Sequence, residues 1–236
     1  MKNISKIVSA LNLKPYSPEV MIDALKQFPK IERAYSMLNS RKRNYTLEKH
    51  TLMVCSMFEK YFNSVPFPEE FGINLFRMLL CLHDVGKPDS IISEEKILQS
   101  QYTEKMIEEI YEFLPINLSE YKILIALLSD DPLGLYIRGK LELENTQLKI
   151  NCMAKKADID MVEFMKLLLI YYQVDATAYT REGYIGNIPD FQEKTKLENH
   201  FKKNEYGDLV FSHAKRRLEF SSEIEEKISI LFEGLV

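Results

Sequence analysis

The residues best suited to chemistry are His83 and Asp84, which are adjacent and follow directly on the apolar residues 79–82. An imidazole and a carboxylate buried at the end of such a run lose their hydration, and this is costly unless a partner replaces the water. A bound cation is the simplest partner for both groups. The pair therefore indicates a metal site.

Two further ionisable residues lie on apolar faces of predicted helices. His50 follows Leu47 by three residues and precedes Val54 by four, so it faces the interior of its helix. Asp175 interrupts the apolar stripe of a long helix predicted over residues 158–179. We therefore expect His50, His83, Asp84 and Asp175 to be the metal ligands.

Two other aspartates, Asp158 and Asp160, compete with Asp175 for the role of last ligand. Lys155 and Lys156 precede Asp158, so both aspartates lie near the polar start of the long helix. Capping of that helix also explains both carboxylates. The sequence therefore favours Asp175 and leaves the other two as alternatives.

The expected donor set consists of two imidazoles and two carboxylates, which suits one divalent ion: Mn, Fe, Co, Ni, Zn or Mg. Such an ion lowers the pKa of bound water and neutralises charge on a phosphoryl oxygen, so hydrolysis of a phosphate ester is the natural reaction. In this interpretation Asp84 also orients the attacking water. Lys87, one turn beyond His83, would face the substrate phosphate as a catalytic and binding residue.

Two more positions are candidates for substrate binding. Arg43 closes the basic run 41–43 shortly before the His50 helix and could add positive charge at the rim of the site. Asp131 precedes Pro132, where a helix cap explains it as well as a place near the metal does.

Helical periodicity dominates the chain and hairpin signals are nearly absent, so the expected fold class is all-α. Ser17 and Pro18 form a cap and a first helical position, and Gly86 and Pro88 are expected to end the His83 helix through a left-handed glycine. The expected helices cover about 18–28, 29–39, 46–61, 73–83, 102–113, 120–128, 158–179, 191–201 and 212–235. The basic residues 215–217 are expected to lie on the solvated face of the last of these helices.

Composition sets broad limits on function. The 236 residues are 46% hydrophobic and 28% charged, as in an ordinary globular domain, and the net charge of −4 argues against an extensive nucleic-acid surface. The three widely spaced cysteines predict free thiols in a reducing compartment. No apolar run reaches membrane-spanning length and the N-terminus is unlike a signal peptide, so a cytoplasmic protein without membrane contact is expected.

The order of His50, then residues 83–88 with the sequence His-Asp-Val-Gly-Lys-Pro, then a distant Asp175 resembles the HD-domain superfamily of metal-dependent phosphohydrolases. The resemblance spans about residues 46–179. It implies a single domain with an HD-type helical bundle core over about 46–180 and a helical extension over about 187–236. It also implies a metal held by His50, His83, Asp84 and Asp175, and hydrolysis of a phosphomonoester, a phosphodiester or a nucleotide.

The chain departs from the members of this superfamily that bind two or three metals, because residues 85–174 contain no histidine. One metal is therefore expected, and a second would need Asp130 or Asp131. The expected partner is a small, nucleotide-like phosphorylated substrate. Two alternatives stay open: a catalytically silent metal- or nucleotide-binding regulatory protein of HD type, and a helical interaction module without metal.

Overall fold

The computed structural model describes residues 3–40, 43–68, 71–94, 98–184 and 196–235, and it has an all-α fold, as predicted. Two compact units are distinguished: unit 1 comprises Met1–Cys55 and Phe67–Asp130, and unit 2 comprises Ser56–Pro66 and Asp131–Val236. The prediction of one domain with a C-terminal extension stays a prediction.

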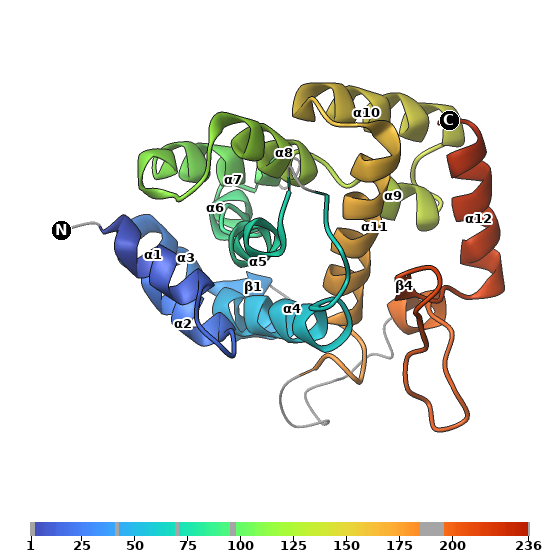
Figure 1. Ribbon diagram of the computed structural model, residues 1–236, viewed down its shortest axis with the longest axis horizontal. Helices are drawn as coiled ribbons and strands as arrows, with labels where there is room; N and C mark the ends of the chain where they lie inside the picture. The colour runs from blue at the N-terminus through green and yellow to red at the C-terminus, as the bar shows by residue number, and fades with distance from the viewer. Residues whose placement is uncertain (1–2, 41–42, 69–70, 95–97, 185–195, 236) are drawn as a thin grey trace. The chain divides into compact units, whose positions relative to one another are not determined.

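Unit 1 contains most of the helices together with one short antiparallel hairpin (Figure 1). Its elements are α1 (Ile4–Leu11), α2 (Pro18–Leu25), α3 (Pro29–Ser36), β1 (Leu38–Ser40), β2 (Arg43–Thr46), the first part of α4 (Leu47–Tyr61), α5 (Ile73–Leu82), α6 (Lys87–Ile92), α7 (Gln99–Glu108), a 3-10 turn (Tyr111–Phe113) and α8 (Leu118–Leu128).

The central element of unit 1 is α5, which contacts α1, α2 and α8. Its last five residues, 78–82, are completely buried, so the helix is apolar on every side at its C-terminal end. A helix with this composition belongs in the middle of a bundle. Whatever follows directly on residue 82 therefore starts inside the protein.

Unit 2 is built around α11 (Met161–Thr177), which packs against α9 (Pro132–Ile137) and α10 (Leu143–Ala157). The buried Gln173 of α11 donates to the Leu218 carbonyl at 2.8 Å and accepts from the Leu218 amide at 3.0 Å. These bonds hold a second hairpin on α11. The remaining elements of the unit are the end of α4, a 3-10 helix (Lys196–His200), β3 (Phe211–Ser212), β4 (Arg217–Leu218) and α12 (Ser222–Glu233).

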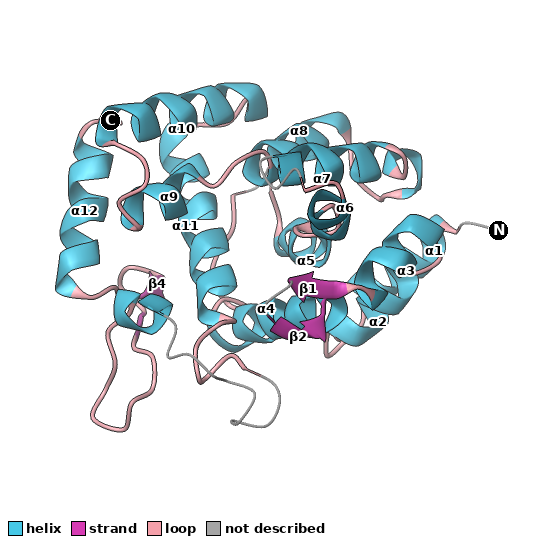
Figure 2. Ribbon diagram, turned by 180° about the vertical axis from the view of Figure 1, so that it is seen from behind, coloured by secondary structure: helices cyan, strands magenta, loops and turns pink. Residues whose placement is uncertain are grey.

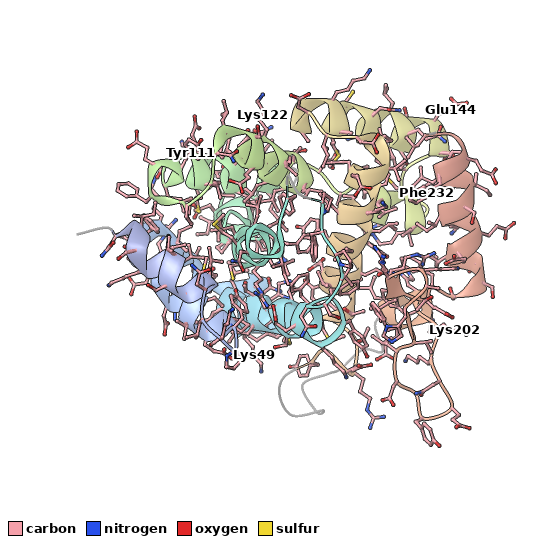
Figure 3. All side chains as sticks on the ribbon, viewed as in Figure 1. Lys49, Tyr111, Lys122, Glu144, Lys202 and Phe232 are labelled. Carbon is pink, nitrogen blue, oxygen red and sulfur yellow. The ribbon has the colours of Figure 1, made fainter. Side chains whose placement is uncertain are left out.

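The predicted caps are confirmed. The Ser17 side chain accepts from Val20 N, with Pro18 in the first turn of α2, and Asp131 accepts from Gly134 N at the start of α9. In Figure 3 the labelled Lys122 and Glu144 project outward from α8 and α10, where charge is solvated. Buried ionisable groups therefore stand out as exceptions to this pattern.

Three predictions about elements are wrong. The helix expected over residues 29–39 ends at Ser36, and residues 38–40 form β1, which pairs with β2 in a hairpin that was not predicted. Gly86 is not in a left-handed conformation, since its φ is −83°, and α6 begins at the next residue. Residues 212–218 form the β3–β4 hairpin instead of the start of the last helix, so the basic residues 215–217 do not lie on a helical face. In addition, α1 and α10 were not predicted. The part of the 191–201 helix before residue 196 falls outside the described residues.

Within the described ranges, no helix combines the length with the hydropathy needed to cross a lipid bilayer.

Candidate metal centre

His50 and His83 are brought together by two neighbouring helices. His50 lies in the first turn of α4, directly after the β1–β2 hairpin, which is drawn beside α4 in Figure 2. His83 is the C-terminal cap of α5, where the fully buried end of that helix delivers it into the interior. The two imidazole ring centres lie 5.3 Å apart. Their relative exposures of 0% and 4% place both rings away from solvent.

Asp84 completes a compact group with the two histidines. Its Oδ2 atom lies 3.6 Å from His50 Nε2 and 3.7 Å from His83 Nε2. These distances are too long for hydrogen bonds. Two ligands bound to one ion at about 2.1 Å lie between about 3 and 4.2 Å apart, so both separations fit a shared cation. The three ligand atoms all lie within 4.8 Å of one another.

The backbone sets the protonation of the His83 ring. Its Nδ1 atom lies 2.6 Å from the Leu80 carbonyl oxygen, which can only accept, so Nδ1 carries the proton and donates. In the neutral form of the ring, this tautomer leaves the lone pair on Nε2, which lies 3.7 Å from Asp84 Oδ2. Metal-binding histidines are commonly oriented in this way, through a hydrogen bond made by the other nitrogen.

The Asp84 carboxylate is held from both sides. Lys87 Nζ donates to Oδ2 at 2.5 Å, and Gln99 Nε2 donates to Oδ1 at 2.7 Å. Burial alone would raise the pKa of Asp84, but the nearby Lys87, His83 and His50 outweigh burial and lower it. The carboxylate is therefore ionised, as a metal ligand must be.

Lys87 is placed at the site, but its observed partner is the carboxylate. Its side chain is mostly buried and reaches back one turn to Asp84. The ammonium thus neutralises the same oxygen that faces the two imidazoles. Contact between Lys87 and a substrate phosphate stays a prediction.

The turn between α5 and α6 depends on the absence of a side chain at Gly86. A Cβ atom there would lie less than 3.0 Å from the backbone of Tyr102 and Thr103 in α7. The Gly86 amide donates to Thr103 Oγ1 at 3.2 Å, which fixes this close approach. Because α7 approaches so closely, Gln99 at its start reaches Asp84.

Gln99 is the residue of the site that the sequence did not reveal. It lies 15 residues beyond Asp84, at the start of a helix that was expected to begin only at residue 102. Nothing in the local pattern separates Gln99 from Gln101, and its role emerges only from the packing of α7 on the turn at Gly86.

The structure does not test the roles predicted for Asp175 and Arg43. Asp175 is a half-buried residue of α11, in unit 2, whereas His50, His83 and Asp84 belong to unit 1. Its assignment as fourth ligand stays a prediction. The backbone of Arg43 belongs to β2, but its side chain is outside the described part of the structure.

Asp131 has a local structural role in unit 2. Its Oδ1 atom accepts from Gly134 N at 2.9 Å, and its Oδ2 atom accepts from Arg138 at 2.8 Å. Burial raises the pKa of Asp131, against the lowering effect of Arg138 and the Gly134 amide, and the charge of Asp175 raises it further. A cap and an ion pair account for this carboxylate, and its contact with substrate stays a prediction.

The two rivals of Asp175 also have local roles. Asp160 caps α11 by accepting from the amides of Val162 and Glu163 at 2.9 and 3.2 Å. Asp158 ends α10 in the left-handed conformation, with φ 57°. Helix boundaries therefore explain both residues, but only Asp160 caps the start of α11 as the sequence suggested, because Asp158 lies at the end of α10.

Comparisons of the chain with protein-family models, with curated proteins and with solved structures find no match.

Proposed function

We propose that the protein is a metal-dependent phosphohydrolase of HD type, acting on a small, nucleotide-like phosphorylated substrate. One observation supports this best: two imidazole Nε2 atoms and one ionised carboxylate oxygen converge in a buried group within 4.8 Å. Imidazole nitrogens together with a carboxylate oxygen form a donor set that first-row divalent ions bind well. The resemblance of residues 83–88 to the HD motif points the same way.

The donor set fits one divalent ion of the series Mn, Fe, Co, Ni, Zn or Mg, held by His50, His83 and Asp84, with Asp175 proposed as a fourth ligand. When bound, the ion would supply an activated water and polarise a phosphoryl oxygen. Fewer protein ligands than a six-coordinate ion accepts leave room for water and substrate.

The residues of the chain contribute orientation and charge. Leu80 and Gln99 fix the His83 ring and the Asp84 carboxylate in direction, so the site is organised before substrate arrives. In this proposal Asp84 also orients the attacking water. Lys87 provides the positive charge that balances the phosphate oxygens in the transition state.

The proposal predicts that the purified protein binds about one equivalent of divalent metal and hydrolyses at least one member of a panel of phosphate monoesters, phosphodiesters and nucleotides. Asp84→Asn removes the charge that faces both imidazoles, so we expect it to lose most of the metal and at least about a hundredfold in kcat/KM. Asp23→Asn is the matched control, since Asp23 is an exposed residue of α2. Elemental analysis and a phosphate-release assay measure both quantities.

Each other outcome has a definite meaning. Metal without turnover across the panel would favour the catalytically silent regulatory protein, and a metal-free wild type would favour the interaction module. If Asp175→Asn keeps full metal content while Asp158→Asn loses it, Asp175 is not the last ligand.

A further inference from the structure

Asn39 has a buried side-chain amide. It is 1% exposed, and neither its Nδ2 nor its Oδ1 atom has a partner in the described part of the chain. An unpaired buried donor and an unpaired buried acceptor each lower the free energy of unfolding. A side chain this costly needs an explanation outside the fold itself.

In β1, which carries Asn39, the burial pattern is the reverse of the usual one, because the polar side chain is buried and its apolar neighbour is exposed. Leu38, the apolar neighbour, is 53% exposed, whereas the amide points inward. Leu38 pairs with Thr46 and Ser40 with Arg43, so two residues of β2 lie opposite Asn39 alone. Bulges of this kind redirect side chains and are frequent beside active sites.

The hairpin links the two sides of the candidate metal centre. At one end β2 leads directly into α4, and the ring of the buried Tyr45 lies 6.5 Å from the ring of His50. At the other, β1 packs against α6, whose first residue is Lys87. Asn39 and Tyr45 both face inward from the hairpin.

The Asn39 side chain offers both a hydrogen-bond donor, Nδ2, and an acceptor, Oδ1, and this limits which ligands can pair with both atoms. A phosphate or a carboxylate only accepts hydrogen bonds and an ammonium only donates, so none of them pairs with both Nδ2 and Oδ1. The edge of a nucleobase offers a donor beside an acceptor, and asparagine pairs with such an edge in a bidentate manner. Aromatic rings such as that of Tyr45 are the usual neighbours of a bound base.

From these observations we infer that Asn39 is a specificity-determining residue that binds the base edge of a nucleotide substrate. The inference rests on the proposed function, because it places the base beside the group that would act on the phosphate. Asn39, His50 and His83 are all buried residues of unit 1.

The test compares wild type with Asn39→Leu, which replaces the amide by an apolar group of similar shape. Affinities for the four common nucleoside 5′-monophosphates and for ribose 5-phosphate, which lacks a base, are measured by calorimetry on the full chain. We expect wild type to bind at least one nucleotide about tenfold or more tightly than ribose 5-phosphate, and Asn39→Leu to lose this preference.

A thermal unfolding measurement without ligand separates this role from a structural one. If the amide is unpaired in the free protein, Asn39→Leu raises Tm. A lower Tm would show that the fold, or a buried water, already satisfies the amide, and this would overturn the inference. Leu38→Ala, on the exposed side of the same strand, is the control and should leave the nucleotide preference unchanged.

Two further outcomes are decisive. A wild type that binds all five probes equally, or an Asn39→Leu protein that keeps the preference, contradicts a base-binding role for Asn39. A preserved nucleotide preference with no phosphate release from any probe would contradict the proposed hydrolysis while leaving the base-binding role of Asn39 intact.

Discussion

At the scale of single residues, the two oxygens of Asp84 have different surroundings. Oδ2 faces both imidazoles and Lys87, whereas Oδ1 accepts from Gln99. A carboxylate anchored through one oxygen presents the other in a fixed direction. Groups that orient a ligand in this way commonly contribute a large part of metal affinity.

We therefore predict that Gln99→Leu weakens metal binding by about 10- to 100-fold. The Nε2 donor is lost while the side chain keeps an apolar body of similar length, so the fold should persist. Gln101→Leu is the matched control, because Gln101 is exposed on the same helix. Competition with a chelator of known affinity measures the effect. Equal affinities in the two variants would show that Gln99 does not orient Asp84.

The sequence identified the three candidate ligands that the structure brings together, but not Gln99, which donates to one of them. His50 and His83 could be identified because each is ionisable on an apolar face with a clear helical period. Asp84 followed from its adjacency to His83. Gln99 could not be identified, because its role depends on the contact between α7 and the turn at Gly86, which no local pattern encodes.

At the scale of elements, the α5–α6 turn depends on close backbone packing. Gly86 has an ordinary right-handed conformation, so its requirement is space and not a positive φ. The turn carries Asp84 and Lys87 on one side and touches α7 on the other. A side chain at this position would push apart the elements that assemble the site.

Gly86→Ala is therefore predicted to lower the free energy of unfolding by about 2 kcal/mol or more, because the added Cβ meets backbone atoms that cannot rotate away. Gly72→Ala is the matched control: it precedes α5, its φ is −68°, and its Cβ would meet nothing within 4 Å. We expect that variant to stay within about 1 kcal/mol of wild type. Chemical denaturation measures both. Equal effects would contradict the packing argument.

The elements that the sequence predicted share strong local signals, and those it missed lack them. The cap at Ser17 and the proline after Asp131 marked helix starts correctly. In contrast, α10 begins after Glu142, whose side chain makes no cap hydrogen bond, and only two of its buried residues, Ile150 and Met153, are large and apolar. The β3–β4 hairpin has Arg216 at φ 53°, where a turn signal would normally be glycine or asparagine.

At the scale of the whole molecule, α4 is shared between the two units. Residues 47–55, including His50, belong to unit 1, and the C-terminal end of the helix belongs to unit 2. In unit 2, Glu182 accepts hydrogen bonds from Lys60 and Tyr61 at this end of α4, and from Leu209 N at 3.0 Å. One mostly buried carboxylate thus joins three segments that are distant in sequence.

This arrangement predicts an acid-sensitive contribution to stability. Burial alone would raise the pKa of Glu182, but the hydrogen bonds from Lys60, Tyr61 and Leu209 outweigh it and hold the pKa below its ordinary value of 4.5. Because the folded pKa is lower than the unfolded one, the stabilisation is complete above about pH 4.5 and is lost as the pH falls through the folded pKa.

At pH 7 we expect Glu182→Gln to lower the free energy of unfolding by about 1 to 2 kcal/mol, a difference that shrinks below pH 4.5. Denaturant unfolding at pH 7, 5, 4 and 3.5 measures it, with exposed Glu205→Gln as control. A gap that stays constant with pH would mean that the charge of Glu182 is not what joins these segments.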